Sequence, residues 1–287
     1  MQNSADALPP SNTRPTWKSY KVYPPLFFLL LAFTLLSQPL SGAAGVEAQA
    51  CAEALDRPVA VPRSSLPRHL NVMIWNIEKA QHADWGTDLA ALGAGSNLIL
   101  IQEAAVQARI GAALPRHLYR SFATGYVTDT QETGVLTLSS AEPTLHCKLT
   151  AREPWLGTPK ATNITEYPIG DTGDRLLVIN VHAVNFTVGL ENFETQLRAL
   201  EPLLANHAGP LIVAGDFNTW SEERTQFLLT FMRDHRLSPV PFRPDLRTRF
   251  REQPLDHVYL RDLTLIAARA VAVNSSDHNP LLITVET

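Results

Sequence analysis

The chain has 287 residues, 45% of them hydrophobic and 18% charged, so it can build a large core and is not intrinsically disordered. It carries 24 Lys and Arg against 28 Asp and Glu, a formal charge of -4, which argues against a nucleic-acid packaging protein because such proteins need excess basic charge. Its two cysteines are too few for a disulfide-built scaffold and lack the C-x-x-C spacing of zinc or redox sites.

The amino-terminal segment has the features of an export signal. Residues 1–25 are polar and basic, residues 26–36 form an uncharged apolar run, and Ala48-Gln49-Ala50 fits a cleavage site. A spanning helix needs about 20 apolar residues, so this run favours a signal peptide, whereas extending it to residue 46 gives a marginal membrane anchor. Two hypotheses stay open: residues 1–50 are cleaved, or residues 26–46 stay as an anchor. Both predict an exported domain, periplasmic, extracellular or held at the outer side of the membrane.

The two cysteines have more than one predicted fate outside the cytoplasm. Cys51 follows the cleavage site directly, so it can pair with Cys147 or carry a lipid. Ala48 is a poor residue for a lipidation signal, which favours the disulfide over the lipid. Two unpaired thiols remain the alternative, because pairing cannot be read from sequence alone.

The rest of the chain predicts a Pro-rich linker at 51–67 and one domain at 68–287. In that domain short runs rich in β-branched residues alternate with helical patterns, which predicts two packed sheets with helices outside them. An Ala-rich helical stretch is expected after each of the first two strands, and a T-x-x-E pattern at Thr219 predicts a helix cap. The expected strands are 71–76, 97–102, 134–139, 145–150, 161–167, 176–182, 211–214, 257–260, 263–273 and 281–285, and the expected longer helices are 191–206 and 219–233.

Acidic, amide and imidazole side chains recur where the predicted strands begin or end, which is where active sites of α/β folds assemble. Each one taken singly is more often a turn former or a structural residue. Their number makes a shared functional site the better interpretation. The residues concerned are Asn76, Gln102, Glu103, Asn180, His182, Asp216, Asn218, Asp256, His257, Asp277 and His278.

Several short motifs resemble, in order, those of the endonuclease/exonuclease/phosphatase superfamily, the fold of DNase I, exonuclease III and neutral sphingomyelinases. The resemblance covers about residues 70–287, and GDFN combined with a terminal SDH is its most specific part. It implies a four-layered α/β sandwich, in agreement with the strand and helix pattern. The motifs are WNIEK (75–79), IQE (101–103), GVLTLSS (134–140), NVHAVNF (180–186), GDFNTW (215–220), LDHVYL (255–260) and SSDHNP (275–280).

The resemblance implies roles for individual residues. Glu103 is the principal metal ligand, with Asn76 beside it and Asp277 supporting the same site. His182 is the candidate general acid for the leaving group, and Asn180 of the same N-x-H motif is expected at the substrate. Asp216 and Asn218 bind the attacking water or the phosphate oxygens, and Asp256 orients His278. The role of general base stays open between Asp216 and His278.

The oxygen-rich ligand set predicts a hard cation, Mg²⁺ or alternatively Mn²⁺, and disfavours zinc, which needs clustered Cys or His. Four arginines precede Asp256, at 243, 247, 249 and 251. Arg249 and Arg251 are candidate phosphate ligands, and a solvated loop is the equally weighted alternative. Lys160 stands where this superfamily often has a basic residue.

These observations predict a metal-dependent phosphoester hydrolase that acts outside the cytoplasm as a monomer. Its substrate is a phosphodiester or phosphomonoester in a nucleic acid, a phospholipid or a small molecule. The alternative is a catalytically inactive module that binds a phosphate ligand on the same scaffold. Against that alternative, every matched acid or base position keeps a side chain competent for catalysis.

Overall fold

The structure is a computed structural model that describes residues 43–55, 64–114, 118–154, 157–171, 173–185, 187 and 189–287. Chain contacts delimit a compact unit from Ser41 to Thr287, which contains every described element. The predicted apolar run at 26–36, nearly all of the predicted anchor at 26–46 and residues 56–63 of the predicted linker lie outside the described residues. Among the helices that are described, none has the length and apolarity needed to cross a membrane.

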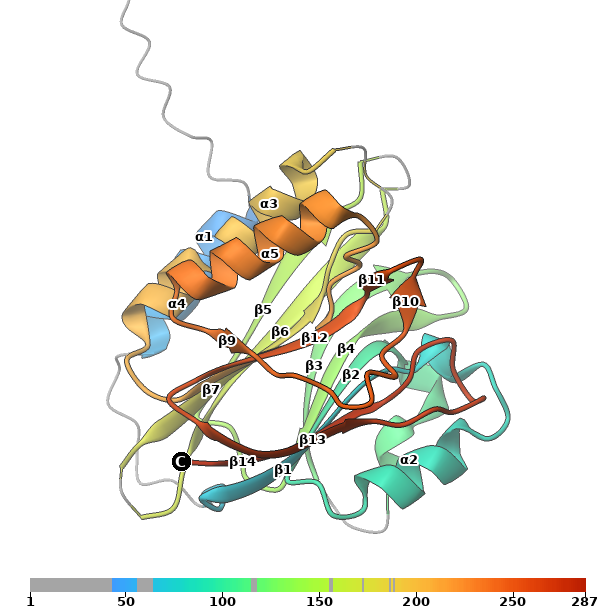
Figure 1. Ribbon diagram of the computed structural model, residues 1–287, viewed down its shortest axis with the longest axis horizontal. Helices are drawn as coiled ribbons and strands as arrows, with labels where there is room; N and C mark the ends of the chain where they lie inside the picture. The colour runs from blue at the N-terminus through green and yellow to red at the C-terminus, as the bar shows by residue number, and fades with distance from the viewer. Residues whose placement is uncertain are drawn as a thin grey trace, which may run out of the picture. The chain divides into compact units, whose positions relative to one another are not determined.

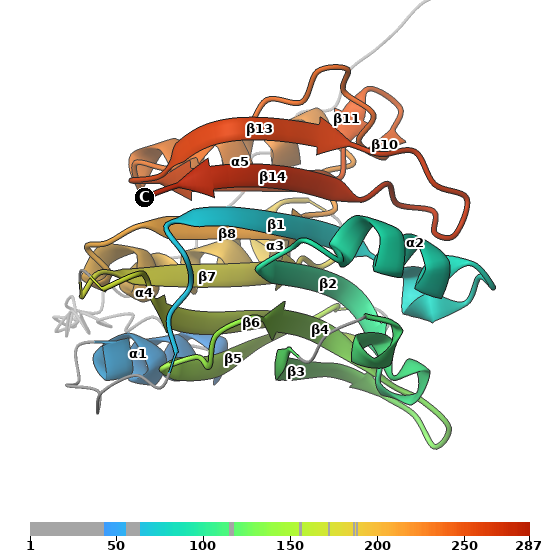
Figure 2. The same ribbon diagram turned by 90° about the horizontal axis from the view of Figure 1, so that it is seen from below.

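Two six-stranded mixed sheets form the centre of the described chain (Figures 1 and 2). The first sheet has the order β13-β14-β1-β2-β4-β3 and the second β5-β6-β7-β8-β12-β9, with a separate β10-β11 hairpin. The strands of the first sheet are β1 (His69–Asn76), β2 (Leu98–Ala105), β3 (Tyr119–Val127), β4 (Glu132–Ser139), β13 (Thr264–Ala270) and β14 (Leu281–Glu286). Those of the second sheet and the hairpin are β5 (Leu145–Arg152), β6 (Pro159–Pro168), β7 (Arg175–His182), β8 (Leu211–Asp216), β9 (Ser238–Pro239), β12 (Asp256–Arg261), β10 (Arg249–Phe250) and β11 (Gln253–Pro254).

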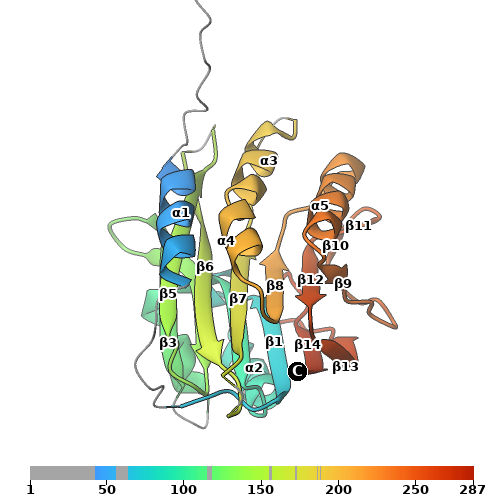
Figure 3. The same ribbon diagram turned by 90° about the vertical axis from the view of Figure 1, so that its left-hand side faces the viewer.

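Helices cover the outer faces of both sheets. On the second sheet lie α1 (Ala43–Leu55), α3 (Glu191–Arg198), α4 (Glu201–Asn206) and α5 (Glu222–Asp234), as Figure 3 shows. On the first sheet lie α2 (Trp85–Gly93) and the short 3-10 helices η2 (Val106–Ala108) and η3 (Ile110–Ala113), while η1 (Glu78–Ala80) follows β1. The predicted four-layered α/β sandwich is therefore confirmed.

The alternation of side chains along the strands explains the layers. In β1, Val72 and Ile74 face the core between the two sheets, whereas Met73 and Trp75 face the helical layer outside. In β7, Leu176 and Val178 face the inter-sheet core, and Ile179 faces α3 and α4. Strands that are buried on both faces need continuous apolar runs, which is how these segments were identified in the sequence.

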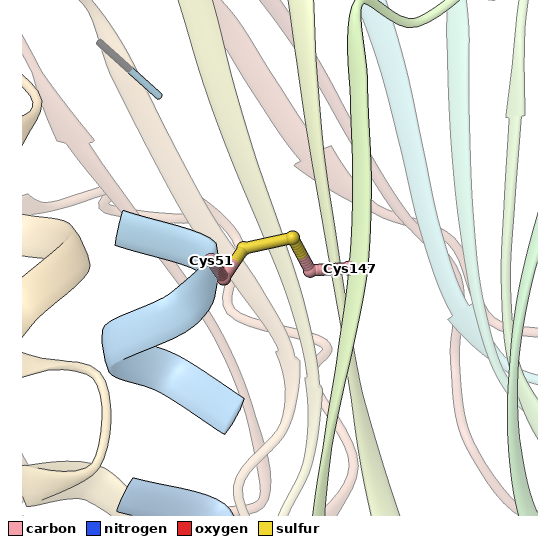
Figure 4. Close-up of a disulfide and its surroundings, with 2 residues drawn as sticks. All are labelled: Cys51 and Cys147. Carbon is pink, nitrogen blue, oxygen red and sulfur yellow. A yellow bond between two sulfur atoms is a disulfide. The ribbon is translucent and has the colours of Figure 1, made fainter. Parts of the chain in front are cut away.

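The amino-terminal boundary differs from the expected one. Helix α1 takes up residues that were assigned to the leader and the linker, and it packs on β5 and α4 through Ala48, Cys51, Ala52 and Leu55. Cys51 forms a disulfide with Cys147 of β5 across 96 residues of sequence, so the favoured pairing is present (Figure 4). Ala48, inside the candidate cleavage site, is 0% exposed. The folded unit thus starts before residue 68, because burial and a covalent link hold α1 to the second sheet.

Three local expectations need correction. The helix expected at 191–206 is two helices, because Pro202 stands at the start of α4, where its missing N–H breaks the hydrogen-bond ladder. The second Ala-rich stretch forms the 3-10 helices η2 and η3. The cap of α5 is Ser221, whose hydroxyl accepts from the Arg224 N–H at 3.3 Å, whereas the Thr219 hydroxyl lies 2.7 Å from His257 Nε2.

Candidate functional site

The register of the strands brings the predicted site residues to one edge of the sandwich. In the second sheet His182 pairs with Asp216 in parallel, and Asp256 pairs with Asp216 in antiparallel register. From the first sheet, Asn76 donates to Asp216 Oδ2 across the gap at 3.0 Å. We call the assembled group the strand-end cluster; it comprises Asn76, Glu103, His182, Asp216, Asn218, Asp256 and His278.

Close backbone contacts shape this edge. Gly215 has φ 137°, and a Cβ there would lie 2.1 Å from the Val181 carbonyl oxygen, so β8 can lie against β7 only with glycine at this position. Glu103 and Asn218 have left-handed backbones, with φ of 50° and 49°. Such conformations cost free energy in residues other than glycine and concentrate at functional sites.

Asp256 and His278 form a buried carboxylate–imidazole pair. His278 Nδ1 lies 2.8 Å from Asp256 Oδ2, and the His278 carbonyl accepts the indole N–H of Trp75 at 2.8 Å. Burial alone would lower the pKa of His278, but the Asp256 and Asp216 carboxylates outweigh it and raise that pKa to about 10. The two carboxylates therefore favour the positively charged form of the His278 imidazole at neutral pH.

For Asp216, in contrast to His278, burial outweighs the effect of the opposite charge nearby on the pKa. Its Oδ1 accepts the backbone N–H of Asn218 at 2.9 Å, and its Oδ2 lies 4.0 Å from His278 Nε2. Burial raises the pKa of Asp216 to about 6 and the charge of Asp256 adds to that rise, while His278 opposes it. A carboxyl group with this pKa can take up a proton near neutral pH, so Asp216 is better suited than His278 to the role of base.

His182 occupies the centre of the charged groups. Its Nε2 lies 3.0 Å from Lys160 Nζ, 3.6 Å from Asp216 Oδ2 and 3.7 Å from Glu103 Oε1. Burial and the charge of Lys160 lower the pKa of His182 well below its usual value. The ring is therefore neutral in the free protein and accepts a hydrogen bond from Lys160. To act as a general acid, His182 must first take up a proton. It can do so only when a bound anion raises its pKa.

Two further carboxylates, Glu78 and Asp277, lie near Glu103 of the strand-end cluster. Glu103, whose side chain is 20% exposed, lies 2.7 Å from Lys79 Nζ, and the Asp277 N–H donates to Glu78 Oε2 at 3.2 Å. Burial raises the pKa of Asp277, and the charges of Glu78 and Glu103 raise it further against the effect of His278. Such mutual repulsion between carboxylates is relieved by a cation, and an oxygen-only set fits Mg²⁺. Glu78 was not singled out in the sequence, although it stands in WNIEK two residues after Asn76.

Among the described residues, Asp216, Asp256 and His278 also have ligand atoms that all lie within 4.8 Å of one another. The charged imidazole of His278 already neutralises one of those carboxylates, so the set forms its own ion pair. The side chain of Asn76 is occupied as well: its amide N–H donates to Asp216 and its oxygen accepts the Glu78 N–H at 3.1 Å. Glu103 is also ion-paired, with Lys79 Nζ at 2.7 Å, but its side chain is 20% exposed, so its carboxylate is more accessible to a metal than those of the buried Asp216 and Asp256.

The structure contradicts the predicted substrate contact of Asn180 and shows how the candidate phosphate ligands Arg249 and Arg251 are held. Asn180 is 0% exposed, accepts from Gln102 Nε2 at 2.6 Å and donates to the Leu136 carbonyl at 3.1 Å. It therefore braces the strands beneath the cluster and is not available to a substrate. Arg249 lies in β10 and is engaged by Asp245 and the Glu252 carbonyl, while Arg251 packs over Phe250 at the end of the hairpin. Arg247, in contrast, reaches the Asp256 carbonyl at 3.3 Å.

A cavity of about 240 Å³ opens beside the strand-end cluster, between the β3–β4 hairpin and β6. Its lining includes the polar side chains of Glu103, Lys160 and His182 and the less polar residues Tyr126, Val135 and Pro159. The cavity is continuous with the reactive groups and can hold the part of a ligand next to a phosphoryl group.

Comparisons with known proteins agree with this arrangement. A model of the Endonuclease/Exonuclease/phosphatase family matches residues 73–278. The UPF0294 protein VP2298 of Vibrio parahaemolyticus is 41% identical over 221 residues, covering 75% of this chain and 76% of that protein. A UPF0294 protein of Klebsiella pneumoniae is 39% identical over 227 residues, covering 79% and 85%.

Solved structures share the fold at low sequence identity. An endonuclease/exonuclease/phosphatase from Beutenbergia cavernae has a TM-score of 0.60 and 16% identity, covering 76% of this chain and 72% of that one. ANGEL2, described as a 2',3'-cyclic phosphatase, has a TM-score of 0.59 and 12% identity, covering 78% and 96%. With the family match over most of the domain and the relatives above, these likenesses identify the superfamily that the motifs suggested. The chain belongs to the endonuclease/exonuclease/phosphatase family.

Proposed function

We propose that the protein is a divalent-metal-dependent hydrolase of phosphoester bonds. Membership of the family supports phosphoester hydrolysis as the class of reaction. The observation that carries the proposal is the pairing of Asp216, whose pKa is about 6, with the His278 imidazole, whose pKa is about 10 and whose Nε2 lies 4.0 Å from Asp216 Oδ2. Groups with separated pKa values side by side are the arrangement expected of acid–base catalysis.

The residues divide the chemistry between them. Glu103, with Asp277 and Glu78 near it, would hold Mg²⁺ or Mn²⁺, which supplies charge to polarise a phosphoryl oxygen. Asp216 accepts the proton of the attacking water, and the imidazolium of His278 stabilises negative charge on the phosphoryl oxygens. His182 stands beside the cavity, where it donates a proton to the leaving oxygen once the bound phosphate has raised its pKa.

A substrate panel tests this proposal. DNA, RNA, sphingomyelin, phosphatidylinositol phosphates and a chromogenic diester are each incubated with the protein, with and without Mg²⁺. We expect metal-dependent hydrolysis of at least one class, absent from an Asp216→Asn control. Binding of a phosphorylated ligand with no hydrolysis of any class would instead identify the inactive binding module.

The pKa of Asp216 predicts the acid side of the pH profile. Because the base must be ionised and kcat/KM reports ionisation of the free enzyme, kcat/KM should rise about tenfold between pH 5 and 7, with a midpoint at about 6. His278 keeps its charge across this range, since its pKa is about 10. Initial rates at substrate concentrations well below KM check this, with Glu194→Gln on α3 as a control of unchanged profile. A rate that is flat or falls between pH 5 and 7 would contradict the role of Asp216.

We also propose that the domain acts outside the cytoplasm. The disulfide between Cys51 and Cys147 supports export, because disulfides persist in oxidising compartments. Cleavage after Ala50 would cut within α1, which supports a mature chain that keeps this helix.

A reporter fused after Thr287 tests the location. A reporter active only in the periplasm or outside the cell should be active in the fusion, and one active only in the cytoplasm should be silent. The opposite pattern would contradict export. Mass spectrometry of the mature amino terminus then separates a cleaved signal from a retained anchor.

A further inference from the structure

Arg224 is a buried arginine whose guanidinium hydrogen-bonds to the loops that follow β7 and β8, next to the strand-end cluster. It belongs to the first turn of α5 and is 1% exposed. Its terminal nitrogens donate to the Val184 carbonyl at 2.8 Å and to the Asn218 carbonyl at 3.0 Å. A further bond reaches the Asn185 carbonyl at 3.3 Å, and another reaches the hydroxyl of Thr187.

These acceptors belong to the two loops that carry the reactive groups. Val184 and Asn185 follow His182 at the end of β7, and Asn218 follows Asp216 at the end of β8. Asn218 adds a direct link, because its amide donates to the Ala183 carbonyl at 3.0 Å. One planar guanidinium thus joins both loops, and its hydrogen-bond partners within the described part of the chain do not include Asp216 or His182.

The position is costly for a charged group. Burial lowers the pKa of Arg224 to about 10 against the opposing charge of Glu153, so the side chain stays protonated at neutral pH. The indole of Trp220 and the ring of Phe193 enclose it, with the guanidinium carbon 4.5 Å and 4.9 Å from their centroids. Only arginine offers several donors in one rigid plane, so lysine or methionine cannot hold the same carbonyls together.

We propose that Arg224 is a positioning residue that sets the spacing between His182 and the Asp216–Asn218 pair. Without it the two loops lose their shared donor and the proton donor and the base move apart. Displacements of about 1 Å in such groups cost about 100-fold in rate. This inference rests on the proposed function for its kinetic consequence.

The chain contains a matched control in Arg261. This arginine lies in β12, is 4% exposed and donates to the carbonyls of Leu204 and His207 near the end of α4. Like Arg224 it holds backbone carbonyls from a buried position, but those carbonyls belong to the α4 end of the fold rather than to the catalytic loops. Arg261→Met should therefore lower thermal stability and leave kcat within about twofold of wild type.

The test compares Arg224→Met, Arg224→Lys and Arg261→Met below their unfolding temperatures. We expect both Arg224 variants to lose about 100-fold in kcat, while KM changes less than about threefold. Arg224→Lys should retain at most a small part of the wild-type kcat. A second readout needs no substrate: the imidazole carbon–proton NMR signal of His182, assigned with His182→Gln, should shift in Arg224→Met and stay in place in Arg261→Met.

The outcomes separate the two proposals. If the wild-type protein hydrolyses none of the substrates, the proposed function is wrong. The NMR signal of His182 would still decide whether Arg224 positions that residue. Active wild type with Arg224 variants that match Arg261→Met in kcat and in the His182 signal would overturn the positioning role. Failure of both Arg224 variants to fold, with Arg261→Met folded, would also overturn it, because it would assign Arg224 to global stability.

Discussion

Glu103→Gln is expected to cost about 1000-fold in kcat/KM, equivalent to about 4 kcal/mol of transition-state stabilisation. The substitution keeps the shape of the side chain and removes the negative charge that would hold the metal. The position is prepared for that charge, since Lys79 Nζ lies 2.7 Å and Lys160 Nζ 3.9 Å from its oxygens. The amide of glutamine cannot form either ion pair.

The measurement is kcat/KM over a range of Mg²⁺ and Mn²⁺ concentrations, with calorimetric titration of Mn²⁺ as a readout of binding. The Glu103→Gln protein should bind the metal more weakly, and excess EDTA should abolish wild-type activity. Glu194→Gln on α3 serves as the control, because it removes a carboxylate from a helix on the outer face of the second sheet. Full wild-type activity in EDTA would show that the residues around Glu103 do not serve a metal.

The sequence was informative where one physical constraint dominates. Strands buried on both faces must be apolar throughout, so segments such as β1, β7 and β8 were predicted close to their observed bounds. Parallel strands end at the same edge of a sheet, so β7 and β8 bring His182 beside Asp216, and β1 and β2 bring Asn76 beside Gln102. That the two sheets meet at this edge was implied by the family resemblance.

Other features depend on tertiary contacts that a sequence does not state. Strand β3 was not predicted, because its residues are largely exposed or half-buried and give no apolar run. Helix α1 consists mainly of small residues, which also suit a cleavage region, and only its burial and the disulfide reveal its place. Asn180 and His182 are two residues apart in β7 and lie on the same face of the strand, but Asn180 stands further from the strand end and bonds to Gln102 and Leu136, which the sequence does not state.

Protonation states are the clearest case of this dependence. Asp216 and Asp256 are both buried aspartates at strand ends, but only Asp256 is hydrogen-bonded to the His278 imidazole. The division of the base role between Asp216 and His278 could not be inferred from the motifs, because it follows from the distances between three buried groups.

The pair formed by Asp256 and His278 predicts strongly non-additive kinetics. His278→Ala removes the imidazolium, and Asp256→Asn removes the carboxylate that keeps it charged and oriented. Each single variant should lose about 100-fold or more in kcat/KM, and the double variant should be little worse than His278→Ala alone. Removing one partner of a buried ion pair costs about 3–5 kcal/mol of folding stability, so thermal unfolding is measured for each variant.

Asp256→Asn alone has a further consequence for pH. The wild-type His278 stays protonated because its pKa is about 10, and loss of the Asp256 carboxylate lowers that pKa, because burial is then opposed only by the charges of Asp216 and Asp277. The charged form is then lost as pH rises through the lowered pKa, so the variant should lose activity toward alkaline pH in a range where the wild type is unaffected. A variant with the wild-type alkaline limb would show that Asp256 does not hold the charge of His278.

His182 should act on the leaving group, whereas the Asp256–His278 pair should act at the phosphoryl group. A nitrophenyl leaving group needs no proton and an alkyl leaving group does, so His182→Ala should reduce kcat/KM about 100-fold for the alkyl ester and far less for the nitrophenyl ester. His278→Ala should affect both esters alike, because the charge it supplies is needed at the phosphoryl group in either case. Strict additivity of the Asp256 and His278 substitutions, or an equal effect of His182→Ala on both esters, would show that these roles are assigned to the wrong residues.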